Sequence, residues 1–252
     1  MRTRDAGASE DSAKSIMREW DTSALAVVVC DMWDAHHCVT ATRRTATLAT
    51  PVDRVARALR AEGALIIHAP AGCATFYAGT EARTRASSAP TVRAPSAIDW
   101  NDWEQDERSS LADSLINPGP CMCTNQTPCN SGEPPYPWSR QIPTIEIAAA
   151  DAVTDDGQEV FNLLEQQEIV DILVMGVHTN ACVLGRPYGI RQLVRLGKRP
   201  VLCRDLTDAF HHDYRGLRWG TPQVVAHIER RWCPTVTSDQ LAGGTRFVLA
   251  DD

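Results

Sequence analysis

Continuous runs of apolar residues, many of them β-branched, recur along the chain between longer amphipathic segments. A run that is apolar at every position, such as 25–30, is typical of a strand buried on both faces of a parallel sheet. Six segments are predicted as strands, at residues 25–30, 64–68, 144–147, 172–175, 200–203 and 235–237.

Segments with apolar residues at helical spacing lie between these strands. Helices are predicted over residues 50–63, 155–167 and 182–197, and from residue 221 onwards. Thr50 and Pro51 suit a first helical turn, and Pro187 is expected to kink its helix or delay the start. The alternation predicts an α/β fold with a doubly wound, mostly parallel six-stranded sheet. Functional sites in such sheets form outside the carboxyl ends of the strands.

The chain is predicted to form one α/β domain over residues 23–252, preceded by a loose polar arm at 1–22. Within that domain, residues 78–140 are rich in Pro, Ser, Asn and Gly and lack apolar periodicity. A long segment of this kind in a compact protein is often a lid or a binding loop. We therefore expect a lid-like insertion at about 78–140.

Composition narrows the possible partners. The formal charge of −7 argues against nucleic acid as the partner, since phosphate binding needs a basic face. The longest apolar runs are too short to span a bilayer, and residues 1–20 lack the apolar stretch of a signal peptide. A cytoplasmic protein without membrane association is therefore expected. Most of the nine cysteines lie singly in apolar stretches, where a free thiol behaves as a small hydrophobic group.

Two polar groups are predicted at neighbouring strand ends. Asp31 follows the first strand, and Cys182 follows the fourth strand after a tight turn, near the start of a helix. A helix N-terminus favours a thiolate, and its N–H groups can stabilise an oxyanion. A carboxylate nearby can accept the thiol proton and return it to a leaving group. Taken singly, Cys182 also fits a core cysteine and Asp31 a capping residue.

Three segments carry a resemblance to a known family. They are VVVCDMWD at 27–34, MGVHTNACV at 175–183 and RDLTDAF at 204–210. With these segments the chain resembles the isochorismatase-like, nicotinamidase-related cysteine hydrolases over residues 24–70 and 140–240. The resemblance implies that Cys182 is the nucleophile and Asp31 the general acid and base. It also implies a cis peptide between Val177 and His178, an oxyanion hole formed by the backbone N–H groups of His178 and Cys182, and a homo-oligomer.

The sequence departs from this family after the third strand, where the family has a lysine and this chain has none. Glu146 stands in that segment and is a catalytic candidate, with a surface position as the alternative. An anion would raise the pKa of a nearby thiol rather than lower it. His36, His37 or His68 could supply the missing positive charge.

No metal or other cofactor is expected. The Asp-x-His pair of the nicotinamidases is absent after the second strand, although Asp34, His36, His37 and His68 together offer suitable ligands. Cys121, Cys123 and Cys129 are spaced too irregularly for a usual zinc motif. A disulfide or free thiols suit that loop equally well.

A small-molecule substrate is expected, with Trp33, His68, Tyr77 and His178 lining its pocket. Core packing is the alternative for the aromatic residues. The sequence predicts a hydrolase that cleaves an amide or ureide C–N bond through a Cys182 acyl-enzyme. Vinyl-ether hydrolysis of the isochorismatase type, or a non-catalytic binding protein on the same fold, are the alternatives.

Overall fold

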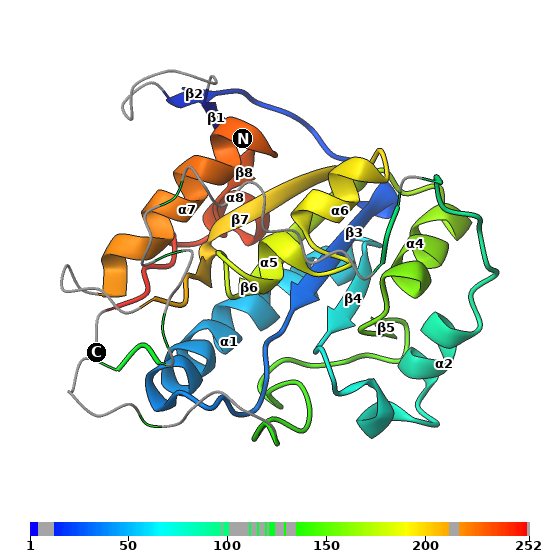
Figure 1. Ribbon diagram of the computed structural model, residues 1–252. Coiled ribbons are helices and arrows are strands. Elements are labelled where there is room, and N and C mark those ends of the chain that lie inside the picture. The colour runs from blue at the N-terminus through cyan, green and yellow to red at the C-terminus, as the bar shows by residue number, and fades with distance from the viewer. Residues whose placement is uncertain are drawn as a thin grey trace.

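The computed structural model describes most of the 252-residue chain (Figure 1). The described residues are 1–4, 13–96, 98–100, 111, 115, 119, 121–123, 129, 135–211 and 217–250. The strands are β1 (Arg2–Arg4), β2 (Ala13–Ser15), β3 (Leu25–Cys30), β4 (Leu65–Ala69), β5 (Ala152–Val153), β6 (Asp171–Val177), β7 (Arg199–Asp208) and β8 (Thr235–Val236). The α-helices are α1 (Val39–Ala61), α2 (Glu81–Ser87), α4 (Gly157–Gln166), α5 (Cys182–Gly185), α6 (Ile190–Arg195), α7 (Leu217–Arg231) and α8 (Asp239–Ala242). Short 3-10 helices span Thr22–Ala24 and Ala74–Tyr77.

These strands form one sheet in the order β2-β1-β8-β7-β6-β3-β4-β5. The six strands from β8 to β5 pair in parallel, which confirms the predicted doubly wound parallel sheet. The added strands β1 and β2 are antiparallel and extend the sheet beyond β8. The chain leaves the central pair β3 and β6 in opposite directions along the sheet, so the carboxyl ends of these two strands mark the point where the strand order reverses.

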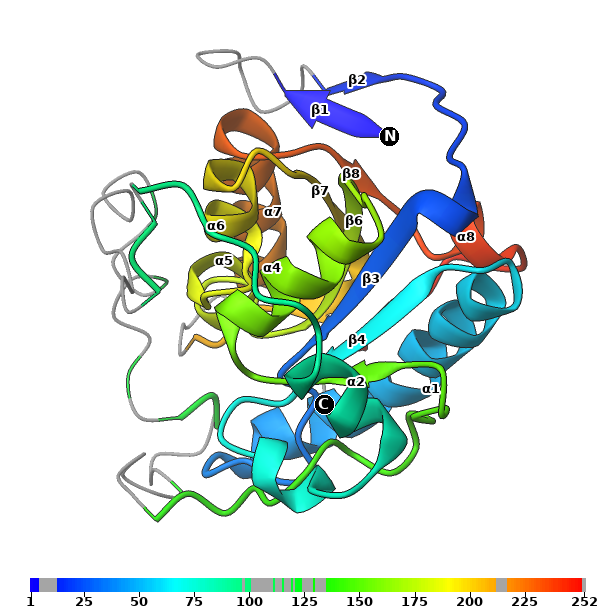
Figure 2. The same cartoon turned by 90° about the vertical axis from the view of Figure 1, so that its right-hand side faces the viewer.

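Alternate residues of β3 serve two separate cores. Ala26 and Val28 pack with side chains from α4, α6 and α7, whereas Val27 and Val29 pack with the buried face of α1. Figure 2 shows α1 on one side of the sheet and α4, α5, α6 and α7 on the other. The protein is therefore a three-layer α/β/α structure, and both faces of the central strands are buried.

Two predicted elements are wrong in position. Residues 144–147 form no strand, because the backbone N–H of Ile145 bonds to Ile142 in a turn and that of Glu146 bonds to the Asp53 carboxylate. The third parallel strand is β5, a few residues later. Helix α1 begins at Val39 rather than at Thr50, and Pro51 lies in its interior. The buried apolar face of this helix continues across the proline, so tertiary packing outweighs the local preference for a first turn.

The helix expected after Cys182 is divided into α5 and α6, and Pro187 lies in the gap between them, as predicted. Helix α7 begins before Thr221. Within the segment expected as a loose arm at 1–22, β1 pairs with both β8 and β2, and residues 5–12 lie outside the described residues. The expected insertion at 78–140 contains α2, and much of the remainder lies outside the described residues. Among the described residues, no helix has the length and apolar content needed to cross a membrane.

Candidate active site

The candidate site lies at the carboxyl ends of the central strands β3 and β6. Asp31 follows β3 directly, and Cys182 follows β6 at the first residue of α5. The strand ends approach closely at Gly176, whose φ is +115° and where an added Cβ would lie 2.1 Å from the carbonyl oxygen of Cys30. Only glycine fits this contact, which brings the Asp31 and Cys182 segments together.

Asp31 is completely buried and is surrounded by hydrogen-bond donors. The backbone N–H of Ala71 donates to Oδ1 at 2.7 Å, and the Tyr188 hydroxyl lies 3.3 Å from the same oxygen. Arg186 Nε donates to Oδ2 at 2.9 Å. Asp31 also adopts a positive φ of +47°, a backbone conformation that is uncommon outside glycine and concentrates at functional sites. The carboxylate is therefore held in one fixed orientation.

Cys182 is 7% exposed, and its thiol lies beside the Asp31 carboxylate, whose negative charge acts on it. The backbone N–H of His178 also points at this thiol, and the Val177–His178 peptide is cis, as the resemblance implies. Burial raises the pKa of Cys182 to about 12; the negative charge of Asp31 adds to the rise, and Arg186 opposes it. At neutral pH the thiol therefore keeps its proton.

Arg186 is a site residue that the sequence patterns did not indicate. Its guanidinium pairs with Asp31, its charge lowers the pKa of Cys182, and it lies 6.0 Å from the ring centre of Trp33. The available signal was its position four residues after Cys182, a spacing that places two side chains on the same side of a helical turn. The resemblance points instead to a lysine after the third strand.

Aromatic and imidazole rings cluster beside this site. The ring of Trp33 stacks on that of Trp138, with centroids 4.4 Å apart, and Trp138 stacks in turn on Tyr136. The ring of His36 lies 5.1 Å from that of His178 and 5.3 Å from that of Phe210. Trp33 and His178 thus lie in one group of neighbouring rings, and Trp138 brings the described end of the insertion against it.

Two of the histidines near the site are unfavourable places for a positive charge. Burial, followed by the charge of His37, lowers the pKa of His36 to about 3. Burial also lowers the pKa of His178 well below its ordinary value, helped by the neighbouring His36 and His37. His68 is completely buried and uses its two ring nitrogens on Gln141, at 2.9 Å, and Asp151, at 3.1 Å. The cation beside Asp31 is instead Arg186.

Three residues expected in the site have other roles. Glu146 is half exposed and pairs with Arg57 and Arg60 on α1, so a catalytic role does not fit its position. His68 belongs to the buried network just described rather than to a substrate wall. The Tyr77 hydroxyl accepts the backbone N–H of Gln141, and its ring packs with Ala82 and Val153. The order of residues along the chain does not reveal these roles, because the neighbours of a strand-end side chain come from distant segments.

The metal ligands considered on the sequence do not gather. Asp34 binds the backbone N–H groups of Ser139 and Arg140 and the hydroxyl of Ser139, whereas His68 is engaged with Gln141 and Asp151. Over the residues that the structure describes, the one group of three or more His, Cys, Asp or Glu side chains placed to share an ion consists of Cys38, Cys121, Cys123 and Cys129. It is separate from Asp31 and Cys182.

No protein-family model matches the sequence, and no curated protein matches it. Solved structures do resemble it. A cysteine hydrolase from Pseudomonas syringae pv. phaseolicola 1448A matches with a TM-score of 0.51 and 15% identity, covering 91% of this chain and 96% of its own. An isochorismatase from Pseudomonas putida KT2440 has a TM-score of 0.51 and 12% identity, with 90% and 94% covered. An isochorismatase family protein from Burkholderia thailandensis has a TM-score of 0.50 and 14% identity, with 87% and 94% covered. The chain therefore has the isochorismatase-like hydrolase fold.

Proposed function

We propose that the protein is a cysteine hydrolase that cleaves an amide or ureide C–N bond of a small molecule. The observation that carries this proposal is the arrangement around Asp31. One carboxylate lies beside the thiol of Cys182 and accepts a hydrogen bond from the guanidinium of Arg186, at the point where the strand order of the sheet reverses. Ligands bind at such points in open α/β sheets.

In the proposed reaction, Asp31 takes the thiol proton as Cys182 attacks the carbonyl carbon of the substrate. The backbone N–H of His178, which faces the thiol, and that of Cys182 are the proposed donors to the oxyanion. Asp31 then protonates the leaving nitrogen, and the C–N bond breaks to leave a thioester on Cys182. Water, deprotonated by Asp31, hydrolyses this thioester and restores the free thiol.

Arg186 takes the electrostatic part that the resemblance assigns to a lysine. Moving a proton from sulfur to Asp31 creates a thiolate in a buried place, and burial opposes that charge. A guanidinium 2.9 Å from the Asp31 oxygen stabilises the single negative charge of the pair, whether it lies on the carboxylate or on the thiolate. Arg186 is therefore proposed to supply the positive charge, although this chain has no lysine after the third strand.

The substrate wall is proposed to consist of Trp33, His178 and the neighbouring Trp138 and Phe210. The insertion contributes Trp138 directly, and a second contact joins it to the site, because the Asn180 amide donates to the carbonyl of Leu115 at 3.0 Å. Residues 78–140 are therefore proposed to set specificity. A cytoplasmic location and a homo-oligomer complete the proposal.

Acyl-enzyme trapping tests the function. Purified protein is mixed with primary carboxamides and N-carbamoyl compounds, quenched in acid, and examined by intact-mass and peptide mass spectrometry, with release of amine or ammonia measured in parallel. We expect one acyl group on Cys182, and loss of both acylation and turnover in Cys182→Ala and Asp31→Asn. The control Glu146→Gln should keep full activity, because this half-exposed carboxylate pairs with surface arginines.

The same variants separate the alternatives. Full turnover by Cys182→Ala would overturn the cysteine mechanism and favour an acid-catalysed reaction such as vinyl-ether hydrolysis. Tight binding of a compound with no turnover, unchanged by Cys182→Ala, would identify a binding protein. Sedimentation equilibrium of the wild-type protein tests the proposed oligomer.

A further inference from the structure

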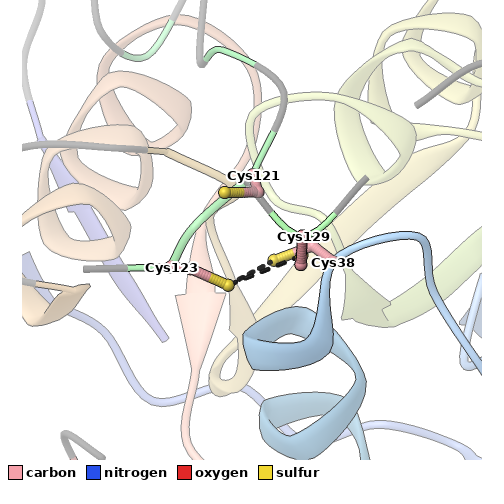
Figure 3. A group of neighbouring side chains, drawn as sticks. All are labelled: Cys38, Cys121, Cys123 and Cys129. Carbon is pink, nitrogen blue, oxygen red and sulfur yellow. Dashed lines mark hydrogen bonds between the residues drawn. The ribbon is translucent and has the colours of Figure 1, made fainter. Parts of the chain in front are cut away.

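Four cysteines from distant parts of the sequence meet outside the candidate active site. Cys38 caps the start of α1, and Cys121, Cys123 and Cys129 come from the insertion. These four residues, here called the cysteine cluster, are all free thiols; three are buried and Cys129 is exposed. Figure 3 shows their side chains gathered beside the first turn of α1.

The sulfur atoms of the cysteine cluster are spaced as ligands of one ion. All four lie within 4.8 Å of one another, with 3.8 Å between Cys38 and Cys123 and 3.6 Å between Cys123 and Cys129. Four sulfurs at the usual zinc–sulfur distance form a tetrahedron with edges of about 3.8 Å. A disulfide would bring two sulfurs to about 2.05 Å. The observed spacing fits a tetrahedral tetrathiolate centre.

Hydrogen-bond donors surround the sulfur atoms of the cysteine cluster. Three consecutive residues in the first turn of α1 donate hydrogen bonds to three of the sulfurs. Val39 N–H donates to Cys129 at 3.3 Å, the Thr40 hydroxyl donates to Cys123 at 3.4 Å, and Ala41 N–H donates to Cys38 at 3.5 Å. The N–H of Met122 also donates to Cys38, at 3.2 Å. Such donors orient metal-bound thiolates and offset their charge. The N-terminal end of the 23-residue helix adds a favourable dipole.

We propose that the cysteine cluster binds one Zn²⁺ through four thiolates as a structural site. Binding replaces the four thiol protons by the metal ion, so no oxidant or reductant is needed. Four protein ligands leave no open position for water or substrate, which is the property of a structural rather than a catalytic zinc site. Hard oxygen-binding ions such as Mg²⁺ do not suit an all-sulfur set.

The position of the site explains what it would hold. Cys38 directly follows His36 and His37 in the loop between Asp31 and α1, and Phe210 packs against the cysteine cluster. The same His36 and Phe210 rings contact His178 beside the nucleophile. A zinc ion would therefore fasten the insertion to the loop that forms one wall of the candidate active site. The sequence had offered only three ligands with irregular spacing, because the fourth precedes them by 83 positions.

Metal analysis of the full-length chain tests the proposal. The protein is purified under reducing conditions, stripped with a chelator, reloaded with Zn²⁺, desalted and measured by inductively coupled plasma mass spectrometry. We expect about one zinc ion per chain, with X-ray absorption giving sulfur ligands at about 2.3 Å. Cys38→Ser and Cys121→Ser should each lose most of the zinc. The control Cys233→Ala, which removes a buried thiol outside the cysteine cluster, should keep it.

Two further readouts do not depend on the variants folding or on catalytic activity. Co²⁺ added to the stripped wild-type protein should give the visible absorption of tetrahedral thiolate coordination, and Zn²⁺ should displace it. Chelation should lower the melting temperature of the wild-type protein, since a metal that binds only the folded chain stabilises it. A wild-type protein that binds no zinc after reloading overturns the proposal, as does a disulfide within the cysteine cluster under reducing conditions. Iron in place of zinc at these four thiolates overturns the assignment of the metal.

Discussion

At the scale of single residues, the charges around Asp31 determine how readily the Cys182 thiol ionises. A buried thiol beside a carboxylate resists ionisation, and the high pKa of Cys182 reflects both burial and this neighbour. Arg186 opposes this rise in the pKa of Cys182, and its guanidinium contacts the Asp31 carboxylate directly. The contact of Arg186 with the pair formed by Asp31 and Cys182 matters more than the strand end from which the positive charge comes.

Replacing Arg186 with alanine should make Cys182 less reactive. Without the guanidinium, the thiolate and the Asp31 anion lose a shared counter-charge, so the pKa of Cys182 rises further above about 12. Each unit of pKa lowers the thiolate fraction at fixed pH about tenfold. Iodoacetamide labelling of Cys182, followed by peptide mass spectrometry between pH 7 and pH 10, should therefore slow by about ten times or more. Arg186→Lys should recover part of the loss.

Arg57→Ala serves as the matched control, because this arginine is half exposed and pairs with Asp53 on the surface of α1. Its labelling rate should equal that of the wild type, and all variants should label alike when denatured. Equal rates for Arg186→Ala and the wild type would show that the guanidinium does not support the nucleophile.

A second residue-scale prediction concerns the buried network of His68, Asp151 and Arg60. Burial alone raises the pKa of Asp151, but hydrogen bonds from His68 and Arg60 outweigh it and leave the pKa below its ordinary value. A carboxyl group with a lowered folded pKa stabilises the protein above its unfolded pKa of about 3.9, and this stability is lost as the pH falls through the folded value. The free energy of unfolding of Asp151→Asn, measured in urea, should differ most from wild type above about pH 5 and approach it only as the pH falls below about 3.9, through the lowered folded pKa of Asp151.

The exposed Glu62 at the end of α1 provides the control for this pH series. Glu62→Gln should track the wild type across the whole range, because surface substitutions change stability by at most about 0.5 kcal/mol. A constant difference between Asp151→Asn and wild type from pH 7 to pH 3 would contradict the assignment of the network as the source of acid sensitivity.

The sequence predicted that Asp31 and Cys182 lie close together, because both follow buried strands whose apolar runs are unambiguous. It was insufficient for Arg186 and Glu146 for one physical reason. Each reaches its partner through a side chain several bonds long, so its neighbours depend on how loops fold over the strand ends. Glu146 turns to the arginines of α1, whereas Arg186 turns inward to Asp31. The sequence also did not reveal Cys38 as the fourth member of the cysteine cluster, because this residue lies far from the other three along the chain.

At the scale of elements, strands were predictable where both faces are buried, whereas the short strand β5 was misplaced. The register of β3 with β4 and β6 leaves no polar position inside Leu25–Cys30, so its boundaries follow from hydrophobicity alone. The two-residue strand β5 offers no such pattern. The start of α1 was missed because Cys38, an unusual cap, accepts the N–H of Ala41.

The close approach of β3 and β6 makes Gly176 the most sensitive position in the sheet. A methyl group there would lie 2.1 Å from the Cys30 carbonyl oxygen, and the residue has a φ of +115°. Gly176→Ala should lower the free energy of unfolding by about 3 kcal/mol or more, measured by urea denaturation. Because a displacement of about 1 Å at reacting groups costs about 100-fold in rate, the folded fraction should also lose most acylation of Cys182.

Gly197 offers a matched control for this substitution. It also has a positive φ, +75°, but an added Cβ would meet open space. Gly197→Ala should therefore cost only the backbone term, about 1 kcal/mol, and leave acylation unchanged. Similar losses of stability in the two variants would show that the β3–β6 contact is not a steric limit.

At the scale of the whole molecule, the two edges of the sheet are covered by different elements. Beyond β4 the sheet ends in the two-residue β5, which α2 covers. On the other side, β8 would present its backbone groups to solvent if β1 did not pair with it. An uncovered strand edge invites pairing with another chain. The first residues, which the sequence indicated as a loose arm, therefore form part of the fold.

Two arginines of β1 make this attachment specific. Arg2 Nε and Arg4 Nε donate to the two oxygens of Glu229 on α7, at 2.6 and 2.7 Å, and the Glu229 side chain is fully buried. Removing the partners of a buried charge costs about 3 kcal/mol or more. The double variant Arg2→Ala/Arg4→Ala should lose about that much in urea denaturation and should form larger species by light scattering, because β8 is left as an edge.

Adding Glu229→Gln to the double variant should restore part of the stability, since a neutral amide costs less to bury than a carboxylate. The control Arg18→Ala removes a partly exposed partner of Asp171, which keeps Arg199, so its cost should stay below about 1 kcal/mol. Equal stability of the double variant and the control would mean that the N-terminal strands add nothing to the sheet. Lost stability with rescue by Glu229→Gln would instead show that the buried carboxylate couples the start of the chain to α7, on the far side of the sheet from α1.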